Sequence, residues 1–166
     1  MKNIKVILAL VCIALVLGGS ADARKKNVVK AVGGTIIPQF GIAIDASYDP
    51  KLNNFVPGYK MLNVAILNNS FNIIELNPEK DQWWIKAKAG DKKYRVIGNL
   101  RGEDSTTWNK IPEKSRSLIS YPLLIPIGAR QVIDIFAPKN VPLEDFRELI
   151  IYIDSIGTTF EVLARQ

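Results

Sequence analysis

Short apolar runs separated by turn-forming residues are the main pattern along this chain. The clearest run spans residues 59–68, where Leu62, Val64 and Ile66 fall on one face of a predicted strand. The β-branched run at residues 149–153 predicts a central strand. Turn signals recur about every 8 to 12 residues, and no long amphipathic helix interrupts them. The pattern predicts an all-β sandwich of roughly seven to nine antiparallel strands.

The remaining runs predict shorter elements. Pro38 breaks the run at residues 35–46, which favours a kinked edge strand. Residues 99–117 form the longest polar stretch, in which Asp104 and Pro112 are expected to begin short helical turns. Pro122 and Pro126 favour an extended edge segment over residues 118–127. Further strands are expected at 71–76, 131–136 and 159–163, a loop at 47–59 and a helical turn at 141–146.

Three short motifs resemble a class of bacterial exported immunoglobulin-like sandwich domains, whose members are mostly of uncharacterised function. They are VAILNNS at residues 64–70, GDKKY at 90–94 and IPIGARQVIDIFAP at 125–138. The resemblance spans residues 59–163 and implies an immunoglobulin-like sandwich and export, with no catalytic residues to carry over. The chain departs from the class pattern where Ile127 separates Pro126 from Gly128, and in the long insert at 99–117.

The first 23 residues are typical of a cleaved signal peptide. Lys2 and Lys5 precede an apolar run at residues 6–17, and Ala21-Asp22-Ala23 offers a small-x-small cleavage site. A membrane span needs about 20 apolar residues, so the alternative of a transmembrane anchor is disfavoured. We expect cleavage after Ala23, a flexible basic leader at 24–34 and a single sandwich domain at 35–166. The mature protein would then be periplasmic or secreted and have no transmembrane helix.

Composition excludes several chemistries. The chain has no histidine, and its one cysteine, Cys12, lies in the expected signal peptide. Histidine-dependent triads, thiol nucleophiles and His or Cys zinc sites are therefore excluded, and we expect no cofactor and no metal. The formal net charge of +6 suits anionic surfaces, such as glycans or lipids, and no specific nucleic-acid partner is expected.

Acidic residues keep an enzymatic alternative open. Glu103 and Asp104 are adjacent in the polar stretch, and Asp45 and Asp49 flank an expected edge strand. Two carboxylates could support glycan hydrolysis, and clustered oxygens could bind calcium. The other interpretation is that these side chains face solvent.

The stretch at residues 83–97 is the sharpest feature. A two-residue turn at Gly90-Asp91 would place Lys86 opposite Arg95 and Lys88 opposite Lys93. The strand alternation then divides the hairpin into two faces. The core face carries Trp83, Ile85, Ala87, Tyr94 and Val96, and the other face carries Trp84, Lys86, Lys88, Lys93, Arg95 and Ile97.

Like charges directly opposite each other are unfavourable, so the basic face needs an explanation. It could be an anion site with an aromatic base, it could be neutralised by acids such as Glu103 or Asp104, or it could protect a sheet edge from aggregation. Trp108 is either a second exposed aromatic or a local anchor under its own loop.

Together these features predict an exported, non-catalytic binding module of the bacterial envelope. Its partner would be an envelope protein or an anionic glycan or lipid. The alternatives are a carboxylate-dependent glycan hydrolase, and a structural subunit that pairs through its sheet edges. The candidate binding residues are Trp84, Lys86, Lys88, Lys93, Arg95 and Trp108.

Overall fold

A computed structural model describes residues 27–87 and 91–165. In these residues the chain is mostly β, with eleven strands in three sheets and a few short helices. The strands are β1 (Asn27–Val32), β2 (Ile36–Ile37), β3 (Ile42–Tyr48), β4 (Tyr59–Asn68), β5 (Ile74–Glu75), β6 (Gln82–Ala87), β7 (Lys93–Val96), β8 (Leu124–Ile125), β9 (Arg130–Pro138), β10 (Phe146–Ile153) and β11 (Thr158–Leu163). The helices are η1 (Pro50–Asn54), α2 (Leu100–Glu103), α3 (Ser105–Lys110), α4 (Glu113–Arg116) and η2 (Leu143–Asp145).

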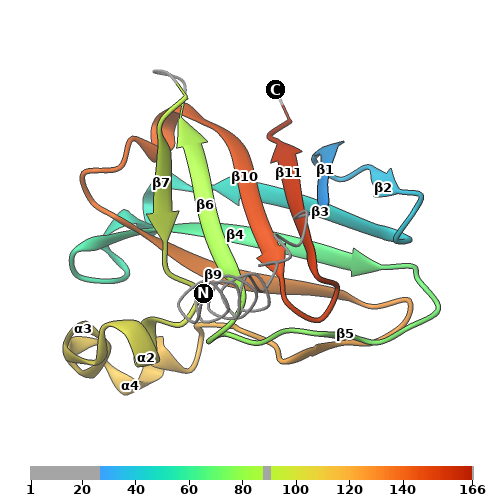
Figure 1. Cartoon of the computed structure of the whole chain (residues 1–166). Coiled ribbons are helices and arrows are strands. Elements are labelled where there is room, and N and C mark those ends of the chain that lie inside the picture. Colours follow the sequence, from blue (N-terminus) through green and yellow to red (C-terminus); the bar gives the residue numbers. More distant parts are fainter. Residues whose placement is uncertain (1–26, 88–90, 166) are drawn as a thin grey trace, which may run out of the picture.

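Two large sheets pack against each other. One has the order β1-β11-β10-β6-β7 and the other has the order β2-β3-β4-β9, while β5 and β8 form a small separate ribbon. In Figure 1 the strands of the four-stranded sheet run behind and across those of the five-stranded sheet. The core between the two sheets is built from the inward residues of both, including Leu62, Val64, Ile133, Ile151 and Phe160.

The two clearest sequence predictions are confirmed. The strand expected at 59–68 is β4, and its predicted inner face is fully buried. The β-branched run at 149–153 lies in β10, which is the middle strand of the five-stranded sheet. Strand β2 is the edge of its sheet, as expected from Pro38. The run at 71–76 is shorter than expected, because only Ile74–Glu75 pair as a strand.

The N-terminal boundary differs from the prediction of a flexible leader at 24–34. Residues 27–32 form β1, which pairs in parallel with β11 from Asn27 opposite Thr158 to Val32 opposite Leu163. The few apolar residues of this short segment did not predict a strand from the local sequence. A partner at the far end of the chain supplies the hydrogen bonds, and this partner cannot be recognised from local sequence.

Hydrogen bonds join the two large sheets at two corners. Ile97 and Phe136 exchange both backbone hydrogen bonds, each 2.8 Å long, just beyond the end of β7. Near the opposite edge, the Gly34 N–H donates to the Ile44 carbonyl at 2.8 Å. These bonds link the two sheets beyond the strands that form their main ladders.

The polar stretch at 99–117 folds into the three short helices α2, α3 and α4, where one or two helical turns were expected. Asp104 caps α3 by accepting from the Thr107 N–H at 3.0 Å, and Pro112 precedes α4, as predicted. The helices cover a second apolar cluster at one end of β4 and β9 that contains Met61, Leu100, Ile111 and Phe136. Within the described residues, no helix has the length and apolar character needed to cross a membrane.

Candidate functional site

The hairpin of β6 and β7 has the two faces that the sequence predicted. Trp83, Ile85, Ala87 and Val96 are buried in the core, with Tyr94 partly buried beside them. The predicted register was wrong by two residues, because Trp84 pairs with Arg95 and Lys86 pairs with Lys93. A shift of two residues keeps every side chain on its own face, which is why the division into faces survives. Lys88 and the expected turn residue Gly90 lie outside the described residues.

Acidic residues from distant strands neutralise much of the basic face. Lys86 donates to both carboxylate oxygens of Glu148 on β10, at 3.0 and 3.2 Å. This hydrogen bond raises the pKa of the Lys86 ammonium. The Nζ atoms of Lys30 and Lys93 lie 3.9 and 4.0 Å from the carboxylate of Glu161. Lys86 and Lys93 are therefore direct cross-strand neighbours whose charges are offset by carboxylates from β10 and β11, and not by Glu103 or Asp104, the acids that the sequence suggested.

Arg95 belongs to a separate and more exposed pair. Its Nη2 lies 2.9 Å from Oε2 of Glu103, one of the two acids, with Asp104, that the sequence suggested as neutralising partners. The Arg95 side chain is 75% exposed. Solvent therefore screens this ion pair, and its contribution to the stability of the fold is at most about 1 kcal/mol. An anionic ligand that offers two oxygens can compete with Glu103 for the guanidinium.

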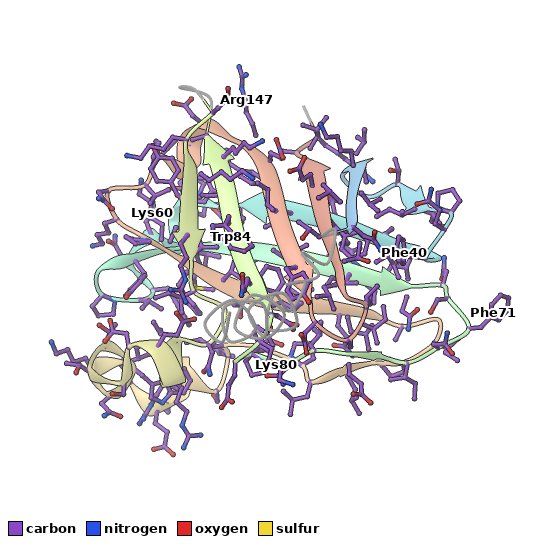
Figure 2. All side chains as sticks on the ribbon, in the orientation of Figure 1. Phe40, Lys60, Phe71, Lys80, Trp84 and Arg147 are labelled. Carbon is purple, nitrogen blue, oxygen red and sulfur yellow. The ribbon has the colours of Figure 1, made fainter. Side chains whose placement is uncertain are left out.

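A groove of about 540 Å³ lies beside Trp84 and Arg95. It is bounded by the turn before β6, the start of β6, the end of β7 and helix α2 with its cap residue Asn99. Figure 2 labels Trp84 on β6, in the front sheet. The groove combines one half-buried aromatic with polar and charged walls, which are Glu79, Asp81, Gln82, Arg95, Asn99 and Glu103.

Asp81 forms the inner end of this groove. It is buried, and its two oxygens accept from the backbone N–H of Asn77 at 2.7 Å and of Asp154 at 2.9 Å. The hydroxyl of Tyr121 donates to it at 3.2 Å. Burial raises the pKa of both the Asp81 carboxyl and the Tyr121 hydroxyl. Because both oxygens are engaged, Asp81 ties the turn before β6 to the end of β10 and acts as a structural residue.

The burial of Asp81 makes a testable prediction for its titration. A carboxyl whose pKa is raised in the native state keeps its proton at pH values where the same carboxyl in the unfolded chain has lost it. Its contribution to the stability of the fold therefore falls as the pH rises from the unfolded pKa through the native pKa. By NMR, the Asp81 carboxyl should titrate with a midpoint above 3.8. Asp104 is the internal control, because its bond from the Thr107 N–H lowers the pKa and its midpoint should fall below 3.8. Equal midpoints would contradict the burial argument.

The other carboxylates named from the sequence each have a hydrogen-bond or ion-pair partner within the protein. Asp104 accepts from the Tyr59 hydroxyl at 3.0 Å as well as capping α3. Asp49 caps η1 by accepting from the Lys51 N–H at 2.9 Å. Oδ2 of Asp45 lies 3.8 Å from Nε of Arg165. Over residues 27–87 and 91–165, no cluster of three or more acidic residues is arranged to hold a metal ion.

The structure does not bring all candidate residues together. Trp108 packs partly buried against the cluster of Met61 and Phe136, so it takes the position of the local anchor, away from the face of Trp84. Glu148, Glu161, Gln82 and Asn99 were not anticipated. The strand order places Glu148 on β10 and Glu161 on β11 beside the hairpin, whereas Gln82 begins β6 and Asn99 follows β7 in the chain. No motif marks any of the four.

Comparisons with known proteins add no assignment. No protein-family model matches the chain, and the searches of curated proteins and of solved structures found no match.

Proposed function

We propose that this chain is an exported, non-catalytic binding module of the bacterial envelope. Its ligand would bind on the outer face of the five-stranded sheet, in the groove beside Trp84 and Arg95. The signal-peptide pattern at residues 1–23 supports export, and the basic charge of the chain supports an anionic glycan or lipid as the ligand.

The strand order supports an immunoglobulin-like sandwich as the finer fold class. With β3, β4, β6, β9, β10 and β11 taken as strands A, B, C, E, F and G, one sheet has the order A-B-E and the other has the order G-F-C. Immunoglobulin folds divide their strands in this way and bury a tryptophan on strand C, the position that Trp83 occupies. The crossing of the two sheets in Figure 1 is a departure, because immunoglobulin sheets pack with nearly aligned strands.

The observation that carries the binding proposal is the pairing of Trp84 with Arg95 at the mouth of a groove. An indole face can stack on the apolar side of a sugar ring, and a guanidinium can bind a carboxylate or phosphate with two parallel hydrogen bonds. Gln82 and Asn99 add amide donors and acceptors to the same walls. Lys86 is held by Glu148, so Arg95 and the more exposed Lys93 carry the anion recognition.

A binding titration tests this proposal with alginate, a carboxylated polysaccharide, and neutral dextran as probes. The protein purified after expression of the full chain should bind alginate in a salt-sensitive manner and should not bind dextran. Arg95→Gln should weaken binding about tenfold, the effect of losing one charge-assisted hydrogen bond. Lys51→Gln is the matched control, because it removes the same charge from the exposed helix η1, which does not line the groove.

Two results would contradict the proposal. The first is the absence of alginate binding at low salt, together with no binding to anionic lipid vesicles. The second is an equal loss of affinity in Arg95→Gln and Lys51→Gln, which would indicate a response to net charge alone. Glu79 and Glu103 also line the groove, so release of reducing ends from alginate would favour the alternative of a glycan hydrolase.

A further inference from the structure

An uncharged apolar tip projects from the end of the molecule beyond β4. Phe71 is 94% exposed, and Ile73, Leu124 and Ile127 are each more than half exposed. In Figure 2 the Phe71 side chain points away from the body of the protein. Residues 68–74 and 123–129 contain no charged side chain. Large contiguous exposed apolar patches often mark contact surfaces.

The turn that presents Phe71 is held in place from within. Asn68 is fully buried, and its Nδ2 donates to the carbonyls of Asn72 and Ile125 at 2.8 and 2.9 Å. Its Oδ1 accepts from the N–H and the hydroxyl of Ser70 at 3.0 and 2.6 Å. The phenyl ring is therefore displayed on a preorganised turn, which lowers the entropy cost of burying it in a contact.

A groove of about 480 Å³ adjoins the same turn. Ser70 and Asn72, which flank Phe71, form part of its wall. Its apolar lining includes Phe40 and Ile156, and Phe40 packs edge-on against the core residue Phe160 with ring centroids 5.2 Å apart. The polar residues of its lining are Gln39, Ser70, Asn72, Glu75 and Ser155. Protein–protein contacts combine apolar and polar side chains in this way.

We propose that this tip is a homodimer interface, in which each Phe71 enters the groove of a second copy of the chain. Each copy offers both a projection and an adjoining groove, so a two-fold axis can pair each projection with the groove of the other copy. The segments 68–74 and 123–129 contain no charged side chain, so such an axis brings no like charges of these two segments together. This inference does not depend on the proposed function.

Sedimentation velocity over a wide protein concentration range tests the interface. The protein purified after expression of the full chain should show a reversible monomer–dimer equilibrium. Phe71→Ala should raise the dimer dissociation constant by roughly 30-fold, as expected for a central aromatic anchor. Ile73→Lys should weaken the dimer similarly, because it places a cation in the groove. Leu118→Ala is the matched control: Leu118 is 69% exposed but lies outside the patch, and the dimer should be unchanged.

A thiol cross-link then tests the geometry. The sequence after the expected cleavage site contains no cysteine, so an equal mixture of N72C and S155C proteins, both of which keep Phe71, should form a heterodimeric disulfide on mild oxidation. A wild-type protein that is monomeric at all concentrations would overturn the proposal, as would a dimer that Phe71→Ala leaves unchanged. A monomer that binds lipid vesicles through Phe71 would also overturn it and would identify the tip as a membrane contact.

Discussion

Replacing Trp83 with alanine should lower the free energy of unfolding by about 4 kcal/mol, the usual loss when a large aromatic is deleted from a core. Trp83 is 3% exposed. Its ring packs edge-on against Tyr121, with centroids 6.3 Å apart and planes at 82°. Its Nε1 is buried without a hydrogen-bond partner among the described residues, so the ring contributes through packing. Urea denaturation followed by far-ultraviolet circular dichroism measures the change.

Trp84→Ala is the control for this experiment, because the next residue in the chain lies on the opposite face of the same strand. It is half-buried beside Arg95 on the outer surface. Its replacement should cost less than about 1.5 kcal/mol, because surface sites lack the cavity penalty of the core. It should instead weaken alginate binding. Equal destabilisation by the two substitutions would mean that the two faces are not distinct.

Replacing Asn68 with alanine should lower the free energy of unfolding by about 3 kcal/mol, because each buried polar group left without a partner costs about 1–3 kcal/mol. The substitution leaves the carbonyl of Ile125 and the N–H of Ser70 without their side-chain partners. It also releases the turn that carries Phe71. Chemical denaturation measures the stability, and sedimentation measures the accompanying loss of the dimer.

Asn69→Ala is the matched control for Asn68. Asn69 has the same side chain and lies in the same turn, but it is exposed. Its replacement should change stability by no more than about 0.5 kcal/mol. If Asn69→Ala were as damaging as Asn68→Ala, the effect would come from the local backbone of the turn and not from the buried hydrogen bonds.

The local sequence pattern was enough to predict a strand and its buried side wherever apolar and polar residues alternate. In β4 the alternation of Leu62, Val64 and Ile66 predicted both the strand and its buried side, because side-chain direction has a period of two residues. Asp104 marked the start of α3 for a similar local reason, because its side chain caps an N–H three residues later. Pro112 marked the start of α4 without a side-chain cap, since proline is favoured where a helix begins. The division of the β6–β7 hairpin into faces follows from the same alternation.

Long-range pairing decided what local patterns left open. The register of the hairpin differs by two residues from the prediction, which rested on an assumed turn length. Residues 27–32 became a strand because β11, more than a hundred residues later, offers its edge. The sequence left both a surface role and an anchoring role open for Trp108, and packing against the cluster that contains Phe136 gives it the anchoring role.

For the candidate site, the sequence by itself determined that Trp84, Lys86, Lys93 and Arg95 share one face, because alternation along a strand is a property of the backbone. Only the tertiary structure decided that Lys86 meets Glu148 and that Arg95 meets Glu103 beside a groove. Those carboxylates come from β10 and α2, and the energy of an ion pair depends on distance and burial, which no local sequence pattern specifies.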